Sequence, residues 1–324
     1  MAMECITALP QRFSENKTKE DPSIFDANLL NQQSNHIPQQ FVWPDHEKPS
    51  SDVQPLQVPL IDLAGFLSGD PFLVSEATRL VSEASKKHGF FLVTNHGVDE
   101  TLLSRAHLFM DSFFKAPACE KQKAKRKWGE SSGYASSFVG RYSSKLPWKE
   151  TLSFKFSPEE KCHSQNIKDF NPKIMIHLTM PRPVLTIVTN VIDLFYTCRN
   201  VYQEYAEAMN ILSLKITELL GMCLGIERRH FRDFFEDSES ILRFCLHRAV
   251  VNSEKDRKTF AFFLCPKGDK VVKPPEELVR VMSGEREYPD FTWSMFLEFT
   301  QKHYRSDMNT LEEFSNWLKN RRSF

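Results

Sequence analysis

Apolar residues recur at intervals of three and four along several parts of the chain, which is the pattern of helices with one buried face. The clearest case runs from Phe72 to Lys87 and ends in a basic turn before Gly89, as is typical of a helix C-terminus. A second helix is expected after the turn at Asn95–Gly97, with Asp99 as its N-cap. The same periodicity predicts three further helices, at Tyr202–Leu220, Trp293–Tyr304 and Leu311–Leu318.

Short apolar runs that are bounded by turn residues predict strands. Two of them, Val58–Leu63 and Phe90–Thr94, lie in the N-terminal half. Two more, His247–Val251 and Thr259–Cys265, are separated by a polar turn, so we expect an antiparallel hairpin there. The mixture of helices and strands indicates a mixed α+β fold class.

Two segments lack such periodicity. Residues 1–55 are rich in Gln, Asn, Ser and Pro, and this composition predicts an extended polar arm that is anchored only near Phe41 and Trp43. The basic stretch Lys121–Arg126 precedes several glycines and serines and is interpreted as a solvated loop.

Composition excludes several classes of protein. Lys+Arg and Asp+Glu both number 42, so no overall charge favours nucleic acid or an anionic membrane. The N-terminus has no basic start followed by an apolar run, and the most apolar stretch, Ile174–Phe195, contains too many polar residues to span a bilayer. The 7 cysteines show no C-x-x-C spacing, which favours reduced thiols. We therefore expect a cytoplasmic protein with neither a nucleic-acid nor a membrane partner.

Three histidines are candidates for chemistry. His96 follows a strand and is expected to cap a turn, and His230 lies in a charged segment that favours a surface position. His247 differs, because the hairpin would place Arg257 and Thr259 beside it, where an imidazole could bind iron and a guanidinium could bind a carboxylate. By spacing alone, His and Arg on neighbouring strands can equally well face solvent.

Longer motifs add weight to the chemical interpretation. The segment LHRAVVNSEKDRKTFAFFLCPKGDKVV, from Leu246 to Val272, resembles the C-terminal part of the plant 2-oxoglutarate dioxygenase core. Upstream, FVWP at Phe41–Pro44, GFFLVTNHGV at Gly89–Val98 and LPWKET at Leu146–Thr151 resemble gibberellin 20-oxidases, in the same order. A related gibberellin 3-oxidase fits LPWKET less well.

This resemblance implies a double-stranded β-helix core, a cupin-like jelly roll, flanked by N-terminal and C-terminal helices. It implies a monomer that oxidises gibberellins, which are diterpenoid acids, with Fe(II), 2-oxoglutarate and ascorbate. It also implies that His247 is the distal iron ligand and that Arg257 and Thr259 bind 2-oxoglutarate. The substrate-binding residues implied by the motif are Leu146, Pro147, Trp148, Lys149, Glu150 and Thr151.

The chain departs from the family pattern in two places. After Arg243 it passes directly into Phe244–His247, where the family has an Asn-Tyr-Tyr-Pro-Pro element and then the His-x-Asp iron motif. None of the 10 histidines is followed two residues later by Asp or Glu, so the chain has no His-x-carboxylate pair with which to bind iron. Residues 171–195 also read as an atypical insert.

These departures define the expected organisation and leave alternatives open. We expect a polar arm at 1–55, an N-terminal dioxygenase region at 56–243 that contains the insert, and an incomplete core remnant with C-terminal helices at 244–324. The chain is then a gibberellin 20-oxidase-type oxidoreductase, a catalytically inactive variant that acts as a binding or interfering module, or the product of a mispredicted gene model.

Overall fold

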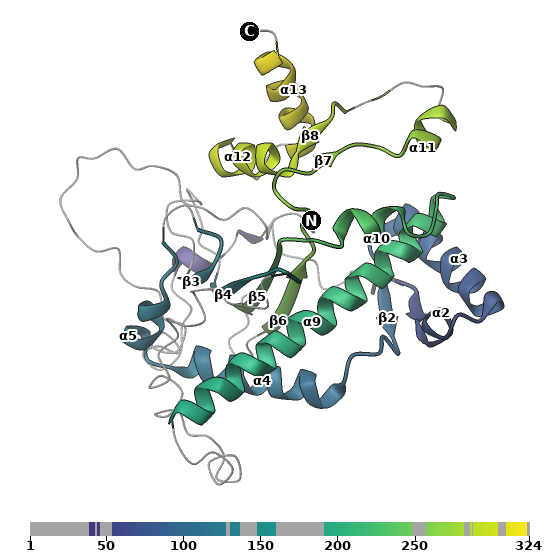
Figure 1. Cartoon of the computed structure of the whole chain (residues 1–324). Coiled ribbons are helices and arrows are strands. Elements are labelled where there is room, and N and C mark those ends of the chain that lie inside the picture. Colours follow the sequence, from purple (N-terminus) through teal and green to yellow (C-terminus); the bar gives the residue numbers. More distant parts are fainter. Residues whose placement is uncertain are drawn as a thin grey trace. The chain divides into compact units, whose positions relative to one another are not determined.

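The computed structural model describes residues 39–42, 44–45, 54–127, 130–136, 148–159, 191–247, 257–281, 286, 288–303 and 309–322 (Figure 1). The chain divides into two compact units, each of which combines segments that are distant in sequence. The first comprises Met1–Val53, Thr101–Ala206 and Ser240–Phe263, and the second comprises Gln54–Glu100, Glu207–Glu239 and Leu264–Phe324.

The first unit is built on an antiparallel sheet with the strand order β3-β4-β5-β6. Its strands are β3 (Gly133–Ser136), β4 (Lys149–Phe156), β5 (Ser240–His247) and β6 (Arg257–Phe263). Strands β4 and β5 pair with each other along their whole length, and β5 pairs antiparallel with β6. This pairing determines which residues of neighbouring strands lie opposite one another. Residues 248–251 of the predicted hairpin lie outside the described residues.

Alternate residues of β5 point to opposite faces of the sheet, and one face is aromatic. The ring of Phe244 lies 4.7 Å from that of Tyr202 and 4.7 Å from that of Phe260. Tyr202 belongs to the long helix α9 (Val191–Cys223), and helix α4 (Glu100–Lys115) contributes His107, which stacks on Phe260 at 4.3 Å. Helices α4 and α9 therefore cover this face, as Figure 1 shows.

The second unit begins with two short parallel strands, β1 (Leu60–Asp62) and β2 (Leu92–Thr94), separated by helices α2 (Ala64–Ser68) and α3 (Pro71–His88). The sequence explains the limits of α3. The side chain of Asp70 accepts hydrogen bonds from the backbone N–H groups of Phe72 and Leu73, and Gly89 ends the helix at a φ of 75°, which a glycine adopts without strain. The buried core around this helix comprises Ile61, Leu63, Phe66, Ala77, Val81 and Leu219.

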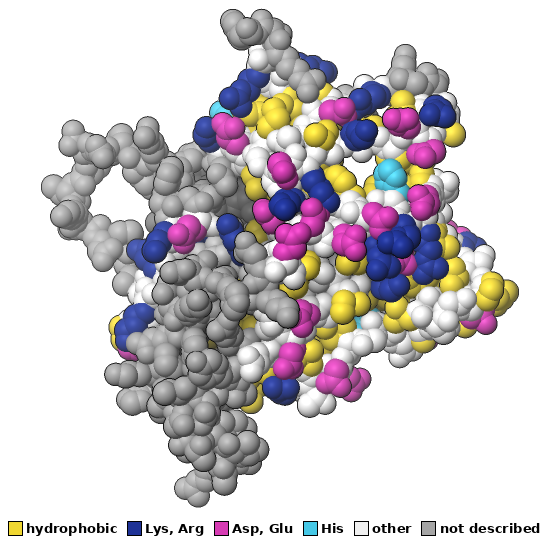
Figure 2. Space-filling model, viewed as in Figure 1, with side chains coloured by type: hydrophobic (Ala, Val, Ile, Leu, Met, Phe, Trp, Pro, Cys, Tyr) yellow, Lys and Arg dark blue, Asp and Glu magenta, His cyan; other side chains and the backbone are white. Residues whose placement is uncertain are grey.

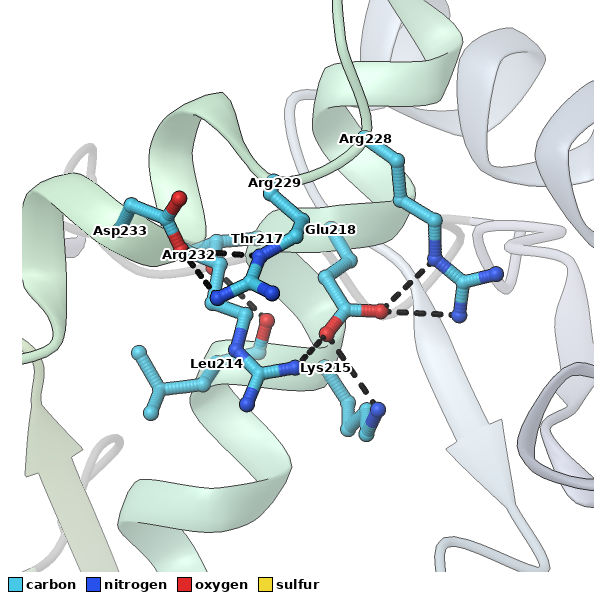
Figure 3. A network of polar contacts seen from close by, with 8 residues as sticks. All are labelled: Leu214, Lys215, Thr217, Glu218, Arg228, Arg229, Arg232 and Asp233. Atoms are coloured by element: carbon cyan, nitrogen blue, oxygen red, sulfur yellow. Dashed lines mark hydrogen bonds and ion pairs between the residues drawn. The ribbon is translucent and has the colours of Figure 1, made fainter.

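A buried carboxylate connects the end of α9 to the short helix α10 (His230–Phe235). The two oxygens of Glu218 accept hydrogen bonds from Arg228 at 2.8 Å and from Arg232 at 2.6 Å (Figure 3). Lys215 adds a third cation at 3.3 Å, and the side chain of Glu218 is only 3% exposed. The carboxylate thus stabilises the turn between the two helices.

The C-terminal segment of the second unit has its own aromatic core. Helices α12 (Trp293–His303) and α13 (Thr310–Arg322) bring Phe296, Phe299 and Phe314 together, with Leu318 fully buried beside them. The remaining described elements are η2 (Gln39–Phe41), α5 (Ala118–Lys121), η4 (Gln122–Ala124), β7 (Val271–Val272), α11 (Glu276–Val281) and β8 (Phe291–Thr292).

Most of the predicted local elements are confirmed, and two interpretations were wrong. Lys121 does not belong to a solvated loop, because its side chain is fully buried and its Nζ lies 2.8 Å from Oε2 of Glu150. His247 ends β5 and does not begin a strand, because pairing with β4 extends that strand back to Ser240. Trp43, Leu146, Pro147 and nearly all of the predicted arm and insert lie outside the described residues.

Two expectations about histidines in turns are confirmed. Nδ1 of His96 accepts a hydrogen bond from the backbone N–H of Val98 at 3.2 Å, and His230 is exposed at the start of α10. No helix within the described ranges has both the length and the apolar character needed to cross a membrane. On the face seen in Figure 2, acidic and basic side chains lie close together, as their equal numbers suggest.

Candidate functional site

The candidate site lies on the second face of the β3–β6 sheet, at the end where β5 finishes. Lys149 of β4 is directly opposite His247 of β5, which in turn is directly opposite Arg257 of β6. Side chains at directly opposed positions of an antiparallel sheet share a face and lie close together. The three residues therefore form a row across three strands, in which a histidine stands between two cations.

The geometry around His247 shows what its ring contacts. Its Nε2 lies 3.4 Å from Nη1 of Arg257 and 3.4 Å from Oγ1 of Thr259. A guanidinium can only donate hydrogen bonds, so in this long contact with Arg257 Nε2 is the acceptor and the ring proton is on Nδ1. The hairpin thus brings together the three residues that the sequence grouped, while their assigned roles stay predictions.

The electrostatic environment of His247 favours its neutral form. Burial, followed by the positive charges of Lys149 and Arg257, lowers the pKa of His247 to about 4. The imidazole is therefore neutral at neutral pH, as a metal ligand must be. The same two cations, however, disfavour a divalent metal ion at this position.

Within the described part of the chain, the other iron ligands are missing from this site. Among the residues that the structure describes, no group of three His, Cys, Asp or Glu side chains could hold a metal ion. A facial iron site requires two histidines and one carboxylate. The strand positions that flank His247 carry Lys149 and Arg257 instead. The residues of this site therefore do not fit an iron centre.

The described residues of the LPWKET motif have different environments. Trp148 is 3% exposed and packs edge-on against Phe41, with 5.1 Å between ring centroids. Glu150 is fully buried, and Thr151 donates a hydrogen bond to the carbonyl of Ala135 at 3.3 Å. Only Lys149 shares a face with His247 and is not fully buried. The substrate-binding role of the motif stays a prediction, and Lys149 is the described member best placed for it.

The sequence interpretation missed a second cationic group on the same face. Arg243, which precedes His247 by four positions in β5, is 1% exposed and donates from Nε to Oγ of Ser153 at 2.9 Å. Nη2 of Arg126 donates to the same oxygen at 3.1 Å. Burial, and then the charge of Arg243, lowers the pKa of Arg126 to about 9. Side chains of a strand alternate between its two faces, so Arg243 and His247, four residues apart, lie on the same face of β5. This spacing was the feature of the sequence that could have revealed Arg243 as part of the site.

Residues 58–174 match the family model described as non-haem dioxygenase in morphine synthesis, N-terminal. Among solved structures, the chain resembles the crystal structure of JOX2 in complex with 2OG, Fe and JA, with a TM-score of 0.67. That similarity covers 90% of this chain and 98% of the other at 20% identity, so it shows the fold alone.

Relatives with known names are much closer in sequence. Gibberellin 20 oxidase 3 of Arabidopsis thaliana is 64% identical to this chain, and the alignment covers 100% of both chains. Gibberellin 20 oxidase 4 of the same plant is 55% identical over 99% of this chain and 100% of the relative.

The first of these alignments extends over 396 positions, whereas this chain has 324 residues, so about 72 aligned positions have no residue here. Because both chains are covered from end to end, these missing positions are internal. The length of the alignment therefore supports an internal deletion, and its location after Arg243 stays a prediction. With 64% identity over its whole length, the chain belongs to the gibberellin 20-oxidase family and is by family a 2-oxoglutarate-dependent oxidoreductase.

Proposed function

We propose that this protein is by descent a gibberellin 20-oxidase-type oxidoreductase of gibberellin biosynthesis, and that the complete enzyme of this type oxidises gibberellin intermediates with dioxygen and 2-oxoglutarate. The observation that carries the proposal is the similarity along the entire chain to two relatives with that name. The proposal includes Fe(II), 2-oxoglutarate and ascorbate as the cofactors of the complete enzyme, a small diterpenoid acid as substrate, and a cytoplasmic monomer without a nucleic-acid or membrane partner.

The fold proposed for the family is a jelly-roll core, and it is incomplete in this chain. The antiparallel sheet β3-β4-β5-β6 would form one wall of that core. About 72 positions are missing in the alignment with gibberellin 20 oxidase 3, enough for several strands of average length and their turns. These positions would include the facing strands and the His-x-Asp iron motif.

The residues that remain support a co-substrate site without its metal. Arg257 and Thr259 would bind the far carboxylate of 2-oxoglutarate, and their contacts with Nε2 of His247 at 3.4 Å support this role. Lys149, opposite His247, could bind a carboxylate of the substrate. His247 would be the one family iron ligand that is retained, and one histidine holds iron far more weakly than three preorganised ligands.

A second candidate function is favoured by the row in which His247 stands between the cations Lys149 and Arg257. In this alternative, the chain is a catalytically inactive variant that acts as a binding or interfering module. The row supports it because no iron ligand besides His247 stands at these opposed positions. For the chain as it stands, we expect this second function, while the first belongs to the complete enzyme.

One experiment separates the two candidates. Purified protein is incubated anaerobically with Fe(II), its bound iron is measured, and 2-oxoglutarate decarboxylation is then assayed in air with a gibberellin present. Gibberellin 20 oxidase 3 of Arabidopsis thaliana serves as the positive control. We expect neither stoichiometric iron nor decarboxylation from this chain. Stoichiometric iron together with gibberellin-dependent decarboxylation would reject the inactive variant. Sequencing the transcript tests the gene model separately.

A further inference from the structure

An apolar pocket lies within the second unit, and none of its lining residues belongs to the His247 face. It opens between the last turns of α3, the end of α9 and helix α10, and its volume is about 340 Å³. This is within the range of roughly 300–1,000 Å³ that is usual for small-molecule sites. The residues that line it are Ser82, Ser85, Lys86, Thr217, Leu220, Cys223, Leu224, Phe231 and Phe235.

Two polar groups in the wall of the pocket, those of Thr217 and Cys223, form hydrogen bonds within the protein. Oγ1 of Thr217 donates to the carbonyl of Leu214 at 2.8 Å. Sγ of Cys223 donates to the carbonyl of Thr78 at 3.2 Å. These two side chains therefore add little polarity to the wall of the pocket. The rest of the wall is largely apolar, with Leu220, Leu224, Phe231 and Phe235. A ligand of this pocket must be largely apolar.

Among the described residues that line the pocket, Lys86 is the only charged one, and it is exposed. Within the described parts of the chain, no carboxylate forms an ion pair with its ammonium group. One positive charge therefore stands at the edge of an apolar cavity.

We propose that this pocket binds a compact apolar molecule with a single anionic group, such as a medium-chain monocarboxylate. The apolar part fills the space between α3, α9 and α10, and the carboxylate pairs with Lys86. This site uses neither iron nor any residue of the His247 face, so it stands or falls independently of the proposed function.

Isothermal titration of the full chain with decanoate and with decanol, below the concentration at which either aggregates, tests the charge requirement. We expect decanoate to bind about two- to five-fold more tightly than decanol, since a partly exposed ion pair contributes little more than that. Lys86→Gln should remove the difference. Lys87→Gln is the matched control, because Lys87 is the exposed neighbour and does not line the pocket; it should leave the difference intact.

A second variant tests the location of the site. Ser85→Trp adds a large side chain to a half-buried position of the pocket wall and should reduce the binding of both probes at least ten-fold. Circular dichroism checks that the variant remains folded. Equal affinities for decanoate and decanol in the unmodified chain overturn the proposal, as does a preference that survives Lys86→Gln. Absence of saturable binding, or binding that Ser85→Trp leaves unchanged, overturns it too.

Discussion

Nζ of Lys121 lies 2.8 Å from Oε2 of Glu150, and both side chains are fully buried. The hydroxyl of Tyr134 donates to the same carboxylate oxygen at 3.0 Å. The pair joins the helical segment after α4 to strand β4, next to the strand position of Lys149. Buried ion pairs contribute modestly as pairs, but the loss of one partner leaves a buried charge without compensation.

Lys121→Met is therefore expected to lower the free energy of unfolding by about 3–5 kcal/mol, because the buried carboxyl group of Glu150 would lose its cationic partner. Urea denaturation of the two proteins measures the difference. Lys123→Met is the control: its ion pair with Glu120 is 46% and 27% exposed, so the change should be at most about 1 kcal/mol. Equal losses for the two variants would contradict the buried pair.

Phe244→Ala tests whether the sheet continues through the point at which the family resemblance breaks off. Phe244 is fully buried and contacts the rings of Tyr202, Phe260 and Phe154. Its truncation should destabilise the fold by about 3–5 kcal/mol, measured by chemical denaturation. Phe72→Ala, at a side chain that is 78% exposed, should have little effect. A small effect at Phe244 would mean that β5 does not form this core.

The Glu218 cluster predicts a dependence of stability on pH. Burial by itself raises the pKa of Glu218, but the hydrogen bonds from Arg228, Arg232 and Lys215 together outweigh it and lower the pKa. A carboxyl whose pKa is lowered in the folded state stabilises that state above its unfolded pKa of about 4.3, and this contribution is lost as the pH falls through the folded pKa.

Glu218→Gln should accordingly lower the free energy of unfolding by about 1–3 kcal/mol at pH 7. The difference between the two proteins should shrink as the pH falls below about 4. Denaturation curves across this range provide the measurement. A difference that stays constant down to the most acidic pH would show that the charge of Glu218 is not what stabilises the turn.

Metal addition should not stabilise this chain. A ligand that binds only the folded state adds about 2.7 kcal/mol at a concentration 100 times its Kd. Because the described residues offer no three-ligand group, anaerobic Fe(II) should leave the Tm unchanged, and a chelator should have no effect. Gibberellin 20 oxidase 3 should show a rise under the same conditions. A saturable rise in this chain that His247→Ala abolishes would contradict the expectation.

Local patterns predicted much of the fold, whereas pairing between distant segments was not predicted. The periodicity of Phe72–Lys87 and the cap at Gly89 define α3 almost to the residue, because they depend only on near neighbours in the chain. The alignment of β4 with β5 joins segments about 90 residues apart, and no local signal specifies it. Lys121 was misplaced for this reason, since its partner Glu150 comes from β4.

In the site, too, contacts between residues close in sequence were predicted, and contacts between distant segments were not. The hairpin placed Arg257 and Thr259 beside His247, because all three lie within one short stretch of chain. Arg126 and Ser153 reach Arg243 only through the assembled sheet, so the sequence alone did not group them. The cationic character of this face is a property of strand register rather than of any motif.

Successive residues of strand β5 point alternately to the two faces of the sheet. Arg243 and Phe244, the residues on either side of the proposed deletion, keep the alternation, so that Phe244 points to the helices and His247 to the opposite face. If the chain had lost one residue more at this point, every later residue of β5 would point to the opposite face. Phe244 would then take the position of Arg243, opposite Ser153. If the deletion lies at this junction, it preserved the alternation of the strand, and that alternation gives the chain a sheet with one aromatic face and one charged face.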